Sequence, residues 1–239
     1  MILGALVDLG VDIKEIRKAL KSIDIGGYKL EEKKVQRKGF SCTQVQIKLE
    51  NKKSRHTHRN YSNIKKLIGN SELPQKIKNN SIKIFEIIAK VEAIIHNSPV
   101  GKVHFHEVGS VDSIVDIVGG VWAIESLKLD KIYSSPLNIG EGFVDCDHGR
   151  LPVPAPATIK LLKGIPVFSS GVKTELTTPT GAAMISFYAK KFQSMPAMTI
   201  TEEGSGAGSR IISSIPNLLR IFVGETLSIE DNELFMIET

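Results

Sequence analysis

Predicted strands and helices alternate through the second half of the chain, and no other feature of the sequence limits the possible folds more. The segments expected there are a helix at 110–127, a strand at 132–139, a helix at 157–163, a strand at 165–169, a helix at 179–192, and strands at 198–203 and 218–223. Strand–helix–strand units of this kind build a sheet that is at least partly parallel. We therefore expect an α/β fold in which a mixed, partly parallel sheet carries helices on both faces.

The first half of the chain adds a basic antiparallel hairpin to this architecture. Residues 28–38 and 41–49 each read as a strand, and a tight turn joins them. In the second strand, Val45 and Ile47 alternate with polar residues, which is typical of a strand with one face on the core. A long helix with an apolar stripe follows at about 74–97, and we expect that stripe to face the core.

Positive charge is concentrated in the first half. Residues 1–98 carry 20 Lys+Arg against 10 Asp+Glu, whereas residues 99–239 carry 11 against 16. We divide the chain here into a basic helix, hairpin and long-helix half and an α/β half, which we expect to form one compact module. The basic excess indicates an anionic partner or, alternatively, a solvated lysine-rich surface. Because no RNA-binding aromatic signature, zinc-finger spacing or heptad-linked basic region occurs, nucleic acid is not the expected partner.

Length and cysteine content are typical of a cytoplasmic protein. A chain of 239 residues buries enough surface to fold without disulfides, and its two cysteines, Cys42 and Cys146, form no CxxC pair. No apolar run approaches the roughly 18 residues of a membrane helix. The chain does not open with a basic segment followed by an apolar one, as a secretory signal would. We therefore expect a cytoplasmic protein with no membrane partner.

The densest group of chemically active residues precedes and enters the helix expected at 110–127. In an extended segment His104 and His106 point to the same side, and Asp112 and Asp116 share one face of the helix. Together with Glu107 they could bind nickel, zinc, iron or manganese, and spacing does not choose among these metals. The helix dipole alone also favours a carboxylate at the first of these aspartates. The second lies in an apolar stretch, where a buried charge is costly unless it is paired or metal-bound.

A second histidine pair, His56 and His58, lies in a basic loop and is a further candidate for metal binding. Positive charge nearby would lower the pKa of each imidazole and favour the neutral form that binds metals. Arg59 could instead hold a phosphate or carboxylate group. Histidines in polar loops are commonly solvated, so the alternative is an exposed loop without a ligand.

The start of the helix expected at 179–192 is a candidate anion site. Thr178 can cap this helix, and the amides of its first turn together with Thr177 and Thr180 could bind phosphate. The small residue Gly181 would admit a ligand. The alternative is a well-capped helix packed closely on the sheet. No Walker A sequence occurs, so an ordinary P-loop nucleotide site is not expected.

Three further residues are candidates for substrate binding. Residues 204–210 read as a glycine-rich turn after a strand, and Arg210 at its end could contact an anion. Asn138 lies at the end of another predicted strand, where ligands of open α/β sheets are often bound. His148 could line the same crevice or, alternatively, belong to a surface turn. No nucleophile motif is present, and we assign no catalytic residue.

Several of these segments match, in order, the pattern of one family. They are residues 56–59 with 61–62, 104–116, 149–157, 175–183 and 204–210. In these segments the sequence closely resembles the nickel insertion proteins of nickel-pincer cofactor biosynthesis (the LarC family). The matches span nearly the whole chain, and each is long enough to make chance a poor explanation.

The resemblance implies a nickel chelatase of the lyase class. Such a protein inserts nickel into pyridinium-3,5-bisthiocarboxylic acid mononucleotide, giving the cofactor of lactate racemase, and the reaction depends on CTP. The resemblance implies that the histidine and aspartate cluster holds nickel, and that the threonine-rich helix start or the basic loop binds the phosphate. It also implies that CTP, with magnesium or manganese, is bound by the family's C-terminal part. We expect that part as a partner, in the same polypeptide or as a separate chain, and a homo-oligomer.

The resemblance also sets expectations for the ends of the chain. Residues 1–10 resemble the helix that follows the family's first strand, and the chain stops about where the family's C-terminal part begins. We therefore expect an N-terminal module, either a fragment or one product of a split gene. Two other functions stay open from the residues alone: a metal-dependent hydrolase of phosphate esters, and a basic nucleic-acid-binding protein.

Overall fold

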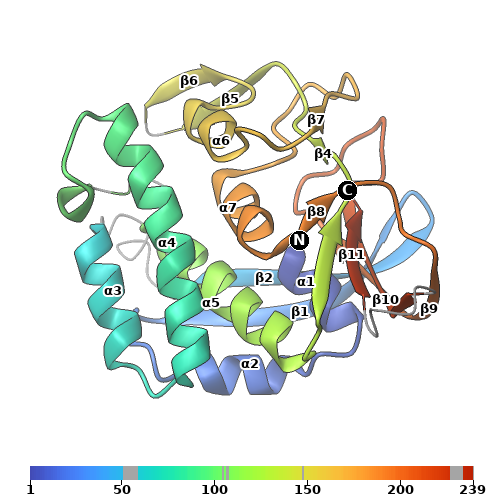
Figure 1. Ribbon diagram of the computed structural model, residues 1–239, viewed down its shortest axis with the longest axis horizontal. Helices are drawn as coiled ribbons and strands as arrows, with labels where there is room; N and C mark the ends of the chain where they lie inside the picture. Colours follow the sequence, from blue (N-terminus) through green and yellow to red (C-terminus); the bar gives the residue numbers. More distant parts are fainter. Residues whose placement is uncertain (51–58, 104, 106–107, 147, 227–233, 239) are drawn as a thin grey trace.

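The computed structural model describes residues 1–50, 59–103, 105, 108–146, 148–226 and 234–238. Figure 1 shows their arrangement. The α-helices are α1 (Ile2–Asp8), α2 (Ile13–Leu20), α3 (Tyr61–Asn70), α4 (Gln75–Ile95), α5 (Val111–Ser126), α6 (Pro156–Leu161) and α7 (Pro179–Tyr188), and a 3₁₀ turn spans Val100–Lys102. The strands are β1 (Tyr28–Arg37), β2 (Phe40–Leu49), β3 (Lys131–Ser134), β4 (Leu137–Asn138), β5 (Phe143–Cys146), β6 (Gly149–Pro152), β7 (Val167–Phe168), β8 (Lys191–Phe192), β9 (Met198–Ala207), β10 (Leu218–Thr226) and β11 (Leu234–Glu238).

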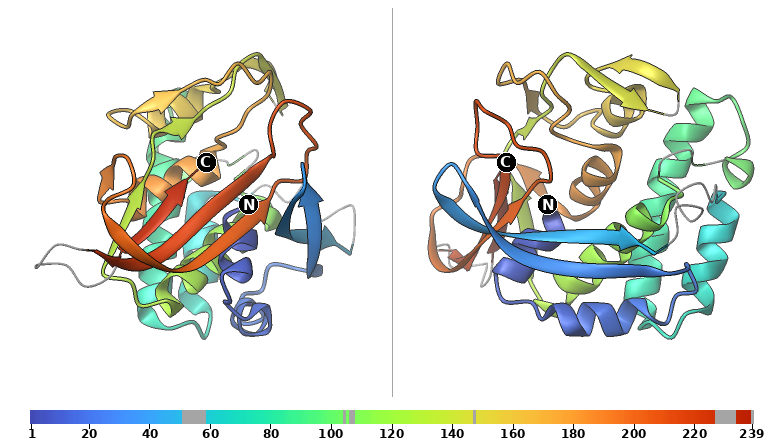
Figure 2. Two further views of the ribbon diagram at one scale, coloured as in Figure 1. Left: turned by 90° about the vertical axis from the view of Figure 1, so that its right-hand side faces the viewer. Right: turned by 180° about the vertical axis from the view of Figure 1, so that it is seen from behind.

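One large mixed sheet organises the molecule, in the strand order β1-β2-β9-β10-β11-β3-β8. The pairs β1–β2, β9–β10 and β10–β11 are antiparallel, whereas β2–β9, β11–β3 and β3–β8 are parallel. The predicted mixed, partly parallel α/β fold and the antiparallel basic hairpin are therefore confirmed. The helices are less evenly placed than expected, because Figure 2 shows no helix in front of the outer face of β9 and β10. Helix α1 contacts β2, β9 and β10 and packs in turn on α5.

Helix α1 lies directly on β9, and two glycines permit this close approach. A Cβ atom at Gly204 would collide with the carbonyl oxygen of Ala5, and one at Gly206 would collide with that of Met1. The glycine-rich turn predicted at 204–210 is therefore wrong for its first residues, which continue β9. Their glycines serve close packing of a helix on a strand and do not serve a turn.

The end of α1 is fixed by the carboxylate of Asp8. It accepts hydrogen bonds from the Lys34 ammonium and the Thr43 hydroxyl, each at 2.5 Å, and from the Ser205 amide at 2.9 Å. Burial by itself would raise the pKa of Asp8, but these hydrogen bonds outweigh burial and lower it. One carboxylate thus joins α1 to β1, β2 and β9.

Helix α5 is the central helix of the core and contacts α1, α2, α4 and α7. Its apolar side chains are buried on nearly every side: Val111, Ile114, Val115, Ile117, Val118, Val121, Ala123 and Ile124. Gly119 and Gly120 let neighbouring side chains approach its axis, the second of them in contact with Met184. A helix that is apolar almost all round must be buried. Neither α5 nor any other helix in the described part of the chain is long and apolar enough to cross a bilayer.

Three helices start at a side chain that caps them. Asp12 accepts a hydrogen bond from the Lys14 amide at the start of α2, and Ser110 accepts one from the Ser113 amide at the start of α5. Thr178 caps α7 in the same way, and proline occupies the first turn of that helix. These starts are local, because each cap satisfies amides only two or three residues away.

Two predicted elements end early in the structure, and their last residues form separate strands. The strand expected at 132–139 ends with β3, because Pro136 has no amide to donate, and the next residues pair with β7 as β4. The helix expected at 179–192 ends with α7, and its last residues pair with β3 as β8. A backbone bond from the Lys190 amide to the Ile132 carbonyl begins this pairing. The hairpin of β5 and β6 was not predicted.

We predict that Gly206→Ala lowers the free energy of unfolding by about 1–3 kcal/mol, because the added methyl group overpacks the contact between α1 and β9. Urea unfolding followed by circular dichroism measures the change. Ser205→Ala is the matched control: its side chain points to the opposite face of β9, so we expect a change within about 0.5 kcal/mol. Equal losses in the two variants would contradict the packing role of the glycine.

Candidate functional site

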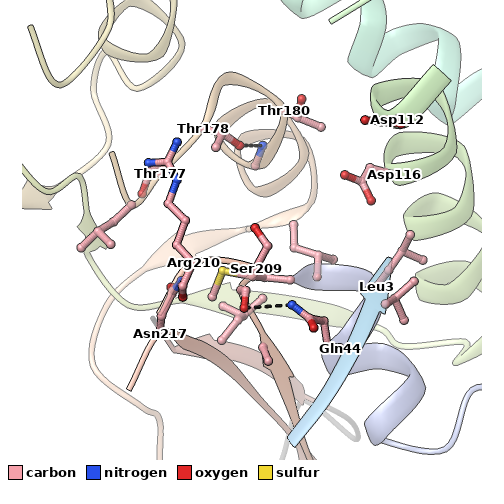
Figure 3. A pocket seen from close by; sticks show the side chains of 18 of the residues that line it. Leu3, Gln44, Asp112, Asp116, Thr177, Thr178, Thr180, Ser209, Arg210 and Asn217 are labelled. Atoms are coloured by element: carbon pink, nitrogen blue, oxygen red, sulfur yellow. Dashed lines mark hydrogen bonds between the residues drawn. The ribbon is translucent and has the colours of Figure 1, made fainter. Parts of the chain in front are cut away.

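A cavity opens where β2 and β9 separate. The two strands run parallel and pair at Thr43 and Gly206, and beyond this pair a cavity of about 700 Å³ lies beside their carboxyl ends (Figure 3). Residues of α1, β2, α5 and α7 and of the loop after β9 line it. Ligands of α/β proteins are commonly bound at such a place, outside the carboxyl ends of the strands. We call it the first cavity.

The first cavity brings together residues that lie far apart in the sequence and that the sequence analysis selected. They are Asp112, Asp116, Thr177, Thr178, Thr180, Gly181 and Arg210. The first two come from α5, the next four from the start of α7, and the last from the loop after β9. Predicted metal-binding and predicted substrate-binding residues therefore share one cavity.

The acidic side of the first cavity is formed by α5. Asp112 and Asp116 lie four residues apart on one face of this helix, and both side chains are partly exposed to the cavity (Figure 3). Burial raises the pKa of Asp116; the N-terminal ammonium at Met1 opposes this shift, and the neighbouring Asp112 carboxylate adds to it, so that the net shift is upward. Two partly buried carboxylates this close together favour a bound cation, because a cation offsets the cost of their burial and screens the repulsion between them.

The opposite side of the first cavity offers groups that bind anions. Thr178 accepts a hydrogen bond from the Gly181 amide at 3.2 Å, which fixes the first turn of α7 at the cavity wall. The guanidinium of Arg210 donates to the Thr174 hydroxyl and is exposed. Figure 3 draws Arg210 and the acidic pair on different sides of the cavity. The Thr177 hydroxyl is buried and donates to a backbone carbonyl at 2.8 Å.

Polar residues of the hairpin hold the loop that carries Arg210. The carbonyl oxygen of Gly208 accepts hydrogen bonds from Arg37 at 2.8 Å and from Gln44 at 3.1 Å. The amide of Asn217 donates to the Arg210 carbonyl at 2.9 Å. Sequence reasoning missed Arg37 and Gln44, because their shared partner lies more than 160 positions away and leaves no local signal. Gln44 could have been noticed only as a polar residue that alternates with the core face of β2.

Three predicted substrate-binding residues, Asn138, Arg59 and His148, lie outside the first cavity. Asn138 organises a loop: its side-chain oxygen accepts from the amides of Gly140 and Ser170, and its side-chain amide donates to the Ser170 hydroxyl. Arg59 donates to the backbone carbonyls of two neighbouring segments, at 3.2 and 3.4 Å. Asn138 and Arg59 therefore make structural hydrogen bonds here, and their binding roles stay predictions.

A second cavity, of about 230 Å³, contains His148. Its ring stacks on that of His96, with centroids 5.0 Å apart and planes inclined by 24°. Glu92 and Cys146 line the same cavity, and Glu175 lines both cavities. His148 is thus placed apart from the residues with which the sequence analysis grouped it.

The predicted ligands His56, His58, His104, His106 and Glu107 lie outside the residues that the structure describes. Their metal-binding roles therefore stay predictions. Within the described ranges, no three histidine, cysteine, aspartate or glutamate side chains are already arranged around one metal position.

Comparison with known proteins shows what the chain is similar to. The sequence model of the family described as nickel insertion protein matches residues 1–239. A putative nickel insertion protein of Dictyoglomus thermophilum is 45% identical over 225 residues, covering 94% of this chain and 57% of the relative. No solved structure matches the chain.

Two further relatives have more specific names. The pyridinium-3,5-bisthiocarboxylic acid mononucleotide nickel insertion protein of Desulfitobacterium hafniense is 45% identical over 226 residues, covering 94% of this chain and 55% of the relative. The protein of the same name in Acetivibrio thermocellus is 43% identical over 249 residues, covering 100% of this chain and 61% of the relative. The chain therefore spans a little more than half the length of these relatives. Because the family match extends over the whole sequence, the chain belongs to the nickel insertion protein family.

Proposed function

We propose that this chain takes part in the insertion of nickel into pyridinium-3,5-bisthiocarboxylic acid mononucleotide, the activity named for its relatives. One observation carries the proposal: the first cavity has an acidic pair on one side and groups suited to an anion on the other. A pyridinium mononucleotide carries a cationic ring and an anionic phosphate, so its two charges match the two sides of the cavity.

The phosphate is bound at the start of α7. The guanidinium of Arg210 offers charge-assisted hydrogen bonds, which are stronger than those between neutral groups. The first-turn amides of α7 and the hydroxyl of Thr180 add donors, and the helix dipole favours negative charge at this end. Gly181 has no side chain, so a phosphate can approach the backbone amides there.

The ring and the nickel ion lie toward α5. Carboxylates are suitable ligands for nickel, which is here a substrate, and Asp112 and Asp116 hold it through oxygen. The raised pKa of the second carboxylate makes protons compete with the metal, which eases release. The thiocarboxylates of the substrate then offer softer sulfur ligands. His104 and His106, predicted from the sequence, would add imidazole ligands at the entrance to α5.

The CTP-dependent part of the activity belongs to the remaining length of the relatives. The matched region covers 55–61% of the relatives described above. We place CTP, with magnesium or manganese, in the other part, either in the same polypeptide or in a separate chain. The nickel chelatase activity, of the lyase class, is then a property of both parts together, and a homo-oligomer stays our expectation.

We predict that Arg210→Gln weakens binding of nicotinic acid mononucleotide, a stable pyridinium mononucleotide, by about tenfold, because a charge-assisted hydrogen bond to phosphate is lost. Isothermal titration calorimetry measures this change. The matching riboside has no phosphate and should bind the variant and the wild type equally. Arg220→Gln, on the outer face of β10, is the control and should change neither affinity. An unchanged affinity of Arg210→Gln for the mononucleotide would remove this residue from the phosphate site.

We predict that Asp116→Asn weakens nickel binding by at least about tenfold without lowering the melting temperature, because it removes both a ligand and a desolvated charge. The nickel affinity of the wild type should decrease as the pH is lowered, because protonation of Asp116 at its raised pKa removes the carboxylate that binds the metal. The variant should lose that part of the pH dependence. Exposed Asp130→Asn is the control. If the Asp116→Asn variant binds nickel as tightly as the wild type, the acidic pair does not supply nickel ligands.

We predict that the isolated chain does not turn over CTP, because the proposed CTP site lies in the other part of the relatives. Incubation with CTP and magnesium or manganese, followed by chromatography of the nucleotides, measures turnover. A heat-denatured sample supplies the background. Turnover above that background would contradict our placement of the CTP site.

A further inference from the structure

A group of hydrogen bonds joins α5, α7 and α4 at the ends of the first two helices. The hydroxyl of Tyr188, at the end of α7, donates to Oε1 of Glu125, at the end of α5, at 3.0 Å. The same oxygen accepts a hydrogen bond from the side-chain amide of Asn80 at 2.7 Å, and Oε2 pairs with the ammonium of Lys76 at 2.6 Å. Both of these partners come from α4. We call these four residues the helix joint.

The carboxylate of the helix joint is largely shielded from water. The Glu125 side chain is 13% exposed, whereas that of Lys76 is 75% exposed. Burial raises the pKa of the Tyr188 phenol, the Glu125 carboxylate raises it further, and Asn80 opposes the shift only in part. The phenol therefore keeps its proton at neutral pH and remains a donor to the carboxylate.

Helices α5 and α7 run side by side in the same direction, from the first cavity to the helix joint. Their N-terminal parts line the cavity, with Asp116 on α5 and Thr180 on α7. Midway along the pair, Met184 lies against Gly120, where an added Cβ atom would collide with the methionine side chain. With a rise of about 1.5 Å per residue, Asp116 and Thr180 are each about 12–14 Å from the helix joint along their helices.

The register between α5 and α7 sets the spacing between the two sides of the first cavity. Asp116 moves with α5, whereas Thr180 and the first-turn amides move with α7, so a slide of one helix along the other changes their separation. The contact of Met184 with Gly120 specifies this register poorly, because methionine is flexible and adapts its shape. A hydrogen bond is directional and weakens steeply when its geometry is lost. The helix joint therefore adds a constraint on register that this apolar contact does not supply.

We propose that Glu125 and Tyr188 are positioning residues for nickel insertion, whose hydrogen bond fixes the spacing at which the first cavity holds a nickel ion and the phosphate of the mononucleotide together. This proposal rests on the proposed function. Neither residue belongs to the described residues that line the first cavity, so neither contacts a ligand there. A ligand bound to one helix alone is indifferent to the register, whereas a mononucleotide that also coordinates the nickel ion requires it. The helix joint therefore acts on the coupling between the two binding events.

Calorimetric titration of the full chain with nicotinic acid mononucleotide, with and without nickel, tests this proposal. The ring carboxylate of this compound coordinates nickel while its phosphate occupies the start of α7. We therefore expect nickel to tighten mononucleotide binding to the wild type by at least about fivefold. In Tyr188→Phe this factor should fall below about twofold, while the affinity for each ligand alone stays within about twofold of the wild type.

Two variants of Glu125 separate the hydrogen bond from the ion pair. Glu125→Gln keeps an oxygen that accepts from Tyr188 but removes the charge that pairs with Lys76, so it should retain the coupling. Glu125→Leu removes the acceptor and should lose the coupling as Tyr188→Phe does. Loss of the coupling in Glu125→Gln would assign the spacing to the ion pair and overturn the role of the hydrogen bond.

Ser186→Ala is the matched control for a purely structural effect on α7. Its hydroxyl donates to carbonyl oxygens of α7 and α6, so this variant disturbs the same helix without removing a bond to α5. Its coupling factor should equal that of the wild type, whatever its melting temperature. Circular dichroism checks that every variant is folded. Equal losses of coupling in Ser186→Ala and Tyr188→Phe would reduce the helix joint to a contribution to stability.

The titrations also separate this proposal from the proposed function. Undiminished coupling in Tyr188→Phe would overturn the positioning role and leave the proposed function standing. The same holds for a wild type that binds both ligands without coupling. A wild type that binds neither ligand would contradict the proposed function and this proposal with it.

Discussion

The burial of α5 on nearly every side is the constraint on which the rest of the structure depends. Apolar side chains of this helix contact α1, α2, α4 and α7, so it cannot rotate without opening the core. Asp112 and Asp116 occupy its remaining polar face and must point into the first cavity. The core thus holds Asp116 in a place where its carboxylate is partly desolvated, and a bound cation would offset that cost.

Close packing of α1 on β9 decides where the first cavity opens. Because Gly204 and Gly206 allow backbone contact, α1 lies beneath the point where β2 and β9 pair. Beyond that pair the strands separate, and the loop after β9 crosses the gap, held by Arg37 and Gln44 through one carbonyl oxygen. The position of Arg210 at the cavity therefore depends on the packing of α1 on β9 and on the hydrogen bonds that hold the loop after β9.

The two cavities differ in the side chains that line them. Oxygen atoms of α5 and the cationic Arg210 dominate the first, whereas the second combines a thiol with two imidazoles. Glu175 lines both cavities.

The sequence alone determined what depends on neighbouring residues: the caps at Ser110 and Thr178, the basic hairpin, the shared face of Asp112 and Asp116, and the resemblance to the nickel insertion proteins. Helical and strand periods act over a few residues, so a linear pattern contains them. Only the tertiary structure decided that Arg210 shares a cavity with the acidic pair, that Asn138 braces a loop, and that β8 replaces the end of a helix. These outcomes depend on strand order and on packing between distant segments, which no local period encodes.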